Sequence, residues 1–200
     1  MSEMLKNDDR VAFDAKFNVF RSIENLPGDT TLFTTRRMET LGLLSADYED
    51  FAIGTFENLD SIRLKWIAPD RFTFIPRAGR PFAFVRYNGE RIEPRRMFTD
   101  GGSIPRLLTV SEEFSPWGYA PAYLIHDWEF DLKHCNRFQK SFEAVRDTMM
   151  EGIKTLMETG IVDRATLSFK LIHGGINSGI ARRIWNRQHP QCPIPADYAE

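Results

Sequence analysis

The clearest pattern in the chain is a run of apolar residues at helical spacing between residues 136 and 160. The apolar positions lie three or four residues apart, which places them on one face of a helix. They are Phe142, Val145, Met149, Ile153, Leu156 and Met157. Asn136 or Ser141 is a candidate start, and Gly160 is the predicted end because glycine commonly terminates helices. We therefore predict an amphipathic helix with one buried face.

Two more helices are predicted around this one. The first spans residues 121–132, with Pro121 near its first turn, where the missing N–H of proline is tolerated. The second spans residues 164–187, begins after Asp163 as the cap, and is broken at His173-Gly174-Gly175.

Before residue 100 the pattern alternates, as expected for strands. The predicted strands cover residues 72–75, 82–87 and 90–93. Asn88-Gly89 between the last two is a hairpin signal in which both turn positions need φ > 0. The predicted fold class is α+β: a small antiparallel β-meander of these consecutive strands, followed by a C-terminal half of three to four helices.

The two ends of the chain differ from this central region. Residues 1–69 have weak periodicity, and we predict an irregular N-terminal extension that docks onto a partner. Residues 70–188 form the predicted α+β domain. Residues 189–200 form a proline-rich tail, which excludes a regular helix or strand there.

Composition excludes some classes of protein. The chain has 200 residues, of which 42% are hydrophobic, so one domain with a real core is expected. A net charge of −2 argues against a general nucleic-acid binder. No stretch has the length of a membrane span, and the N-terminus lacks an apolar signal core. Cys135 and Cys192 fit no metal or disulfide framework, so synthesis in a reducing cytoplasm is the simpler interpretation.

Candidate chemistry concentrates in residues 97–131. A loop of Asp100, Gly101, Gly102 and Ser103 can adopt φ > 0 and lets another group approach closely. His126-Asp127 follows inside an apolar run, where core packing alone does not call for charged groups. Ser103 suits a helix cap better than a nucleophile, because Pro105 follows it at the start of a predicted helix.

Acids from the next helix extend this candidate site. Helices joined by a short connection pack antiparallel, which brings Asp147 or Glu143 beside His126. Asp100, His126, Asp127 and Asp147 are therefore the candidate catalytic residues, for acid–base work. Asp100, His126 and Asp147 are the candidate ligands of a divalent metal. The alternative is a buried polar network that ties the helix to the glycine loop.

Two motifs carry a resemblance to a known family. TDGGSIPR at residues 99–106 and HDW at 126–128, in that order, resemble the bacteriophage and prophage family called domain of unknown function 1353. The resemblance covers about residues 72–187 and implies a phage-related origin but no established activity. Asp147 matches an acidic position of the family, whereas Glu129 and Asp131 depart from its apolar pattern after the His-Asp pair.

Two functions follow as expectations. The first is a virion or assembly component, of the tail or neck, made in the host cytoplasm and located in the virion. Its partners would be other phage structural proteins or a second copy of the chain. The second is a phage-encoded hydrolase that acts on the host cell wall, with or without a metal.

Overall fold

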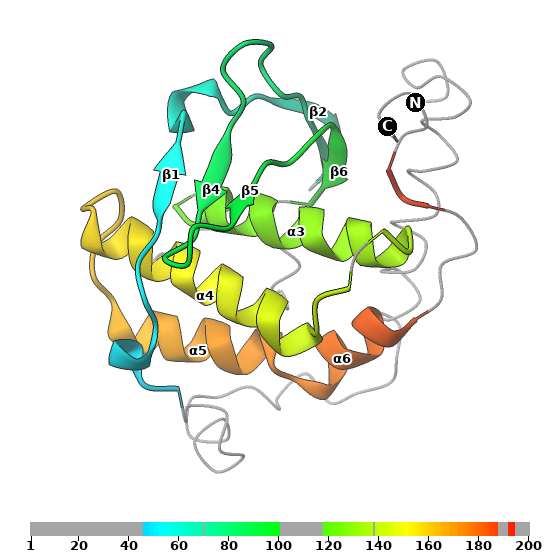
Figure 1. Ribbon diagram of the computed structural model, residues 1–200. Helices are drawn as coiled ribbons and strands as arrows, with labels where there is room; N and C mark the ends of the chain where they lie inside the picture. Colours follow the sequence, from blue (N-terminus) through cyan, green and yellow to red (C-terminus); the bar gives the residue numbers. More distant parts are fainter. Residues whose placement is uncertain (1–45, 70, 101–117, 138, 188–191, 195–200) are drawn as a thin grey trace.

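The computed structural model describes residues 46–69, 71–100, 118–137, 139–187 and 192–194. In this part of the chain, two small antiparallel sheets lie against a set of helices, so the predicted α+β class is confirmed (Figure 1). The elements in chain order are η2 Tyr48–Asp50, β1 Thr55–Glu57, η3 Leu59–Ser61, β2 Leu64–Ala68, β3 Arg71–Phe74, β4 Ala83–Val85, β5 Arg91–Ile92, β6 Met97–Thr99, α3 Ala120–His134, α4 Phe142–Glu158, α5 Thr166–Ile176 and α6 Gly179–Asn186.

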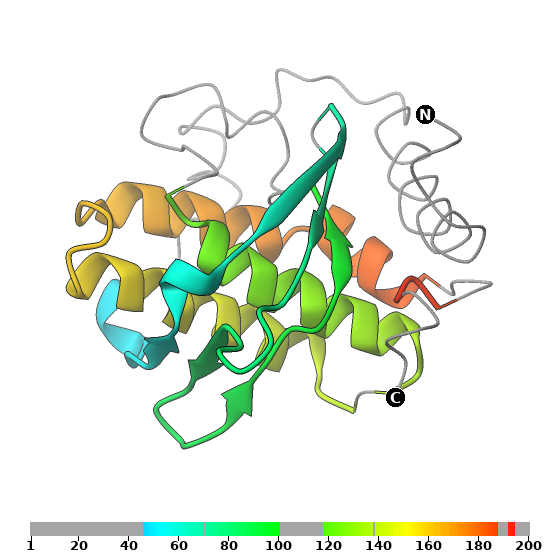
Figure 2. The same cartoon turned by 90° about the horizontal axis from the view of Figure 1, so that it is seen from above.

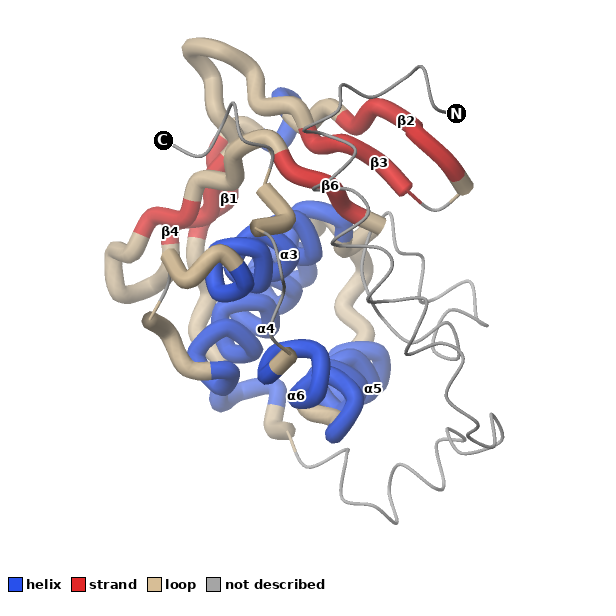
Figure 3. The backbone as a smooth tube through the Cα atoms, turned by 90° about the vertical axis from the view of Figure 1, so that its right-hand side faces the viewer, coloured by secondary structure: helices blue, strands red, loops and turns tan. Residues whose placement is uncertain are grey.

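The strands form two sheets rather than one meander. One sheet has the order β1-β4-β5 and the other β2-β3-β6 (Figure 3). The predicted strand at 72–75 therefore pairs with β2 and β6, and not with the strand that follows it. Pro76 and Pro81 lie in the connection between β3 and β4 and provide no N–H donors, which opposes direct pairing of these neighbours.

The hairpin between β4 and β5 lies where the sequence predicts it, but its turn is of another type. Arg86 N donates to Glu90 O at 2.8 Å, and Gly89 N donates to Arg86 O at 2.9 Å. Gly89 has φ +86°, whereas Asn88 is not among the residues with positive φ. The loop is thus three residues long and ends in one left-handed glycine, as in hairpins with a bulge.

Residues 46–69 are built into the sheets. Thr55 pairs with Val85 and Glu57 with Ala83, so β1 completes the sheet of β4 and β5. Trp66 of β2 pairs with Phe72 of β3. The predicted domain boundary at residue 69 therefore falls between two paired strands. Residues 1–45 lie outside the described residues, and a docking role for them stays a prediction.

Helices α3 and α4 confirm the sequence pattern. All six apolar positions predicted for the buried face of α4 are buried. The Ser141 hydroxyl accepts a hydrogen bond from Ala144 N at 3.1 Å, which caps the first turn. Gly160 follows the end of α4 with φ +71°. Serine and glycine thus mark both ends of this helix as expected.

The break between α5 and α6 lies later than predicted. His173, Gly174 and Gly175 are buried within α5, which ends at Ile176 with Asn177 as its C-cap. Ser178 then begins α6, because its hydroxyl accepts a hydrogen bond from Ala181 N at 3.3 Å. At the other end of α5 the cap position is Ala165 and not Asp163. A capping serine therefore decides the break, rather than the glycine pair.

Helix α3 lies between two hydrophobic clusters. Ala122 and Tyr123 belong to the cluster that α4 and α5 share. Leu124, Ile125 and Trp128 belong to the cluster beneath the strands. Seen from above, the strands lie across the helices (Figure 2). Helix α3 is thus the central element of the fold, with apolar residues on more than one face.

A disulfide joins the end of α3 to the tail. Cys135 and Cys192 are bonded, with their Cα atoms 4.5 Å apart and a sequence separation of 57. The expectation that these cysteines fit no disulfide framework is therefore wrong, because fold and not spacing brings them together. Ile194, two residues later, is buried in the cluster beneath the strands, so this end of the chain is fixed to the core.

Gly54 provides a test of the packing of β1. An added Cβ would lie 2.4 Å from Val85 O and 2.7 Å from the Phe84 ring, so Gly54→Ala should force β1 away from β4. We expect a loss of about 1–3 kcal/mol in the free energy of unfolding, measured by urea denaturation. Gly179→Ala is the matched control, because nothing lies within 4 Å of its Cβ position. Equal stabilities of the two variants would contradict this packing.

The disulfide provides a second test. Cys135→Ser combined with Cys192→Ser should lower the free energy of unfolding by roughly 4 kcal/mol, because the bond closes a loop of 57 residues in the unfolded chain. Urea denaturation with and without a reductant measures the effect. Reductant should destabilise the unsubstituted protein and leave the double variant unchanged. If reductant leaves the free energy of unfolding of the unsubstituted protein unchanged, the bond contributes nothing to stability.

Candidate functional site

Asp127 is a buried carboxylate that joins α3 to β6. The hydroxyl of Thr99, the last residue of β6, donates a hydrogen bond to Asp127 Oδ2 at 2.7 Å. Both side chains are buried. Hydrogen bonds to a charged acceptor are stronger than neutral ones. This pair therefore fixes the edge of a sheet to the central helix, and Thr99 is a partner that the sequence did not identify.

The His126 side chain makes no hydrogen bond to Asp127 and contacts Phe130 instead. Its Nδ1 lies 4.0 Å from Asp127 Oδ1, beyond hydrogen-bond distance, and its ring lies 4.4 Å from the centre of the Phe130 ring. Its side chain is 14% exposed. Among the described residues, no hydrogen bond or ion pair joins His126 to Asp100, Glu143 or Asp147. Adjacent helical side chains diverge by about 100°, which accounts for the separation of the His-Asp pair.

Asp147 and Glu143 bind arginines instead. Asp147 Oδ1 accepts from Arg146 Nε at 2.8 Å, and Glu143 Oε1 accepts from Arg182 at 2.7 Å. Gly152 marks the side of α4 that contacts α3, because its Cβ position lies 3.3 Å from Ala122 Cβ. Asp147 is five residues away, roughly 140° around the helix. Antiparallel packing is therefore not enough to bring Asp147 to His126.

The predicted metal ligands do not form a site. In the described ranges, no group of three or more His, Cys, Asp and Glu side chains could hold a metal ion. Asp100, His126 and Asp147 are all within those ranges and are not brought together in such a group. Asp100 is half-buried at the end of β6. Gly101, Gly102 and Ser103 lie outside the described residues.

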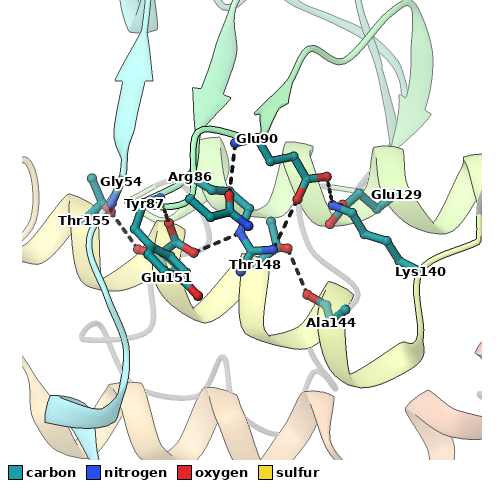
Figure 4. Close-up of polar contacts among 11 residues, drawn as sticks. Gly54, Arg86, Tyr87, Glu90, Glu129, Lys140, Ala144, Thr148, Glu151 and Thr155 are labelled. Carbon is teal, nitrogen blue, oxygen red and sulfur yellow. Dashed lines mark hydrogen bonds and ion pairs between the residues drawn. The ribbon is translucent and has the colours of Figure 1, made fainter.

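The most connected polar site lies instead between the β4–β5 hairpin and α4 (Figure 4). Glu151 of α4 accepts from Arg86 Nε at 2.9 Å and from the backbone N of Tyr87 at 2.7 Å. Its side chain is only 3% exposed. Burial alone would lower the pKa of Arg86, but its bonds to Glu151 and Glu90 outweigh that effect and raise it. The Glu151 carboxylate thus binds both the residue that follows β4 and the first residue of the turn.

The same site continues to α3 through a shared lysine. Lys140 Nζ lies 2.6 Å from Glu129 Oε1 and also binds Glu90 Oε1. Glu90 Oε2 in turn lies 3.3 Å from Arg86. Five charges therefore alternate in sign along one chain of contacts. We call this set the charge chain; its members are Glu151, Arg86, Glu90, Lys140 and Glu129.

Glu129 is the unusual member of the charge chain. Its side chain is 1% exposed, and its Oε2 has no hydrogen-bond partner among the described residues. Burial raises its pKa from the ordinary 4.5 to about 7, although Lys140 opposes the change. A sequence signal existed: Glu129 stands between Trp128 and Phe130, and Glu151 stands beside the buried Met150. A carboxylate inside an apolar run requires a charged or N–H partner from another element.

A second polar cluster attaches the segment before β1 to α4. Lys154 Nζ donates to the carbonyl oxygens of Tyr48 at 3.0 Å and Phe51 at 2.7 Å. The Tyr48 hydroxyl donates to Glu158 at 2.7 Å, and Lys154 and Arg164 each lie 4.7 Å from the centre of the Tyr48 ring. Burial, followed by Glu158, raises the pKa of Tyr48. These contacts position a segment rather than a reacting group.

The described residues thus define an α+β protein in which polar side chains connect elements of the fold. No family model, curated protein or solved structure matches the chain. None of the helices in the described ranges combines the length and apolar character that a membrane crossing needs.

The Thr99–Asp127 bond can be tested directly. Thr99→Val keeps the shape of the side chain but removes the donor, so a buried carboxylate loses one partner. We expect the free energy of unfolding to fall by about 2 kcal/mol. Thr99→Ser keeps the hydroxyl and should cost less. In an Asp127→Asn background, the difference between the two variants should shrink. A valine variant as stable as the serine variant would show that the bond contributes nothing.

Proposed function

We propose that this protein is a structural component of a bacteriophage particle, or of its assembly, in the tail or neck. Its partners are other phage structural proteins or a second copy of the chain. It is made in the host cytoplasm and is then incorporated into the virion. The resemblance of the TDGGSIPR and HDW motifs to a phage family supports the phage origin.

The observation that carries this proposal is the use of the candidate catalytic residues in contacts within the fold. Asp127 binds Thr99, and Asp147 binds Arg146. An active site needs acids, bases and donors that converge on one position where a substrate can lie. The Thr99–Asp127 contact instead connects a strand to a helix, whereas Asp147 binds its neighbour on α4. A buried carboxylate used to connect elements favours a protein whose task is to keep its shape in an assembly.

Exposed apolar side chains at one end of a sheet support a partner surface. Ile53 is 52% exposed and Tyr87 is 66% exposed. Ile53 precedes β1 and Tyr87 lies in the turn after β4, and these two strands pair with each other. Glu151 fixes Tyr87 through its backbone N–H. Apolar surface held in a fixed place is typical of contact sites.

The alternative function is a hydrolase, encoded by a phage, that acts on the host cell wall. One observation favours it: His126 is partly exposed, and Asp127 Oδ1 lies 4.0 Å from its Nδ1. This form of the alternative uses acid–base chemistry and no metal from the predicted ligand set.

Purified particles provide the test that separates the two functions. We expect the chain to be present in virions at a fixed copy number, by quantitative mass spectrometry. A phage with the gene interrupted should yield incomplete particles. Supplying the protein with His126→Ala should restore complete particles, because that ring makes no hydrogen bond within the described residues. Supplying Gly54→Ala, which disturbs packing, is the control expected to restore fewer.

The opposite result would favour the hydrolase. In that case the chain would be missing from purified virions, and the protein would release soluble fragments from isolated cell walls. A folded His126→Ala variant would then lose that activity and fail to restore infection.

A further inference from the structure

Glu129 and Glu90 belong to two different parts of the fold and both bind the ammonium group of Lys140. Glu129 belongs to α3, Glu90 follows the turn of the β4–β5 hairpin, and Lys140 lies in the connection from α3 to α4. Figure 4 shows Lys140 reaching from the helix side toward both carboxylates. The charge chain holds three carboxylates and two cations, so it carries one negative charge in excess. That excess lies in a region where burial disfavours any unpaired charge.

Of the buried carboxylates in the charge chain, Glu129 has the fewest hydrogen-bond donors to stabilise a negative charge. Glu151 has two donors, from Arg86 and Tyr87, whereas Glu129 has one donor and an unpartnered Oε2. Glu129 is also the most buried of the three carboxylates, with 1% of its side chain exposed against 33% for Glu90. A proton is therefore accommodated most easily at Glu129, where it neutralises the excess charge.

We propose that the charge chain is a pH-sensitive clamp: when Glu129 takes up a proton, the ion pair of Lys140 with α3 is lost, while its ion pair with the hairpin residue Glu90 remains. Above neutral pH, Lys140 bridges α3 and the hairpin, and the buried charge on Glu129 destabilises the fold. Below neutral pH, that cost is removed, and Lys140 keeps its ion pair with Glu90 but no longer has one with Glu129. The hairpin that carries exposed Tyr87 is thus attached differently in the two states.

The charged groups around Glu129 fix the direction of the effect. Lys140, from the connection, favours the ionised form, while Glu90, from the hairpin, favours the protonated form. Arg86 acts in the same direction as Lys140 but more weakly, and Glu151 of α4 is reached through Arg86. Because the pKa of Glu129 is raised in the folded state, stability is highest below about pH 4.5 for this group. It falls as the pH rises to about 7.

Urea denaturation of the full chain between pH 5 and pH 8.5 tests the clamp. Relative to Glu129→Gln, the unsubstituted protein should show an unfolding equilibrium constant that rises by roughly 100-fold across this range, because the folded chain holds the Glu129 proton to a higher pH than the unfolded chain does. Glu151→Gln is the control: at every pH it removes the charge and one of the two acceptor oxygens that bind Arg86 and Tyr87, so it should lower stability throughout and keep the pH dependence.

The Glu129 carboxyl itself can be followed by carbon NMR in the folded protein. We expect a midpoint near 7 in the unsubstituted chain, a higher midpoint in Lys140→Met and a lower one in Glu90→Gln. Opposite shifts in these two variants are the signature of a shared lysine. A midpoint near 4.5, or shifts of the same sign, would overturn the proposal. So would a Glu129→Gln variant that keeps the pH dependence of the unsubstituted protein.

Discussion

The burial of helix α3 is the constraint on which the other contacts depend. Strands lie on one side of it and α4 on the other, so side chains on most of its faces leave water. Its polar residues must therefore find partners inside the protein. Asp127 finds Thr99 on one sheet, and Glu129 finds Lys140 in the connection to α4. Each bond fixes a different neighbour at a defined place along the same helix.

The hairpin shows how such bonds replace extensive sheet pairing. Strand β5 has two residues and β4 has three, so their ladder alone gives little stability. Glu151 adds bonds to Arg86 and to the backbone N–H of Tyr87 from the helix below. The carboxylate replaces a neighbouring strand as the acceptor for that N–H. Ionic contacts with α4 therefore position a turn that its own strands could not hold.

Apolar periodicity predicted α3 and α4 well, because their buried faces repeat at short range along the sequence. The pairing of β3 with β6 was not predictable, since β4 and β5 lie between them in sequence and belong to the other sheet. The candidate site was predicted in part. Asp127 is a buried polar residue with a partner, as one alternative required, but Asp147 lies on another side of α4 and binds Arg146. Helical rotation, not proximity in sequence, decides which acids meet.

The disulfide relates the fold to the compartments in which the protein is proposed to be made and to act. The loop that Cys135 and Cys192 close contains α4, α5 and α6, so three helices are held between two fixed points. In a reducing cytoplasm the two thiols stay unlinked, and the bond forms in an oxidising environment. Under the proposed function, in which the chain is made in the host cytoplasm and then joins the virion, it would meet both conditions in turn. Ile194 packs in the same cluster as Leu124 and Trp128 of α3, so apolar packing and the disulfide hold residues 192–194 against the same helix.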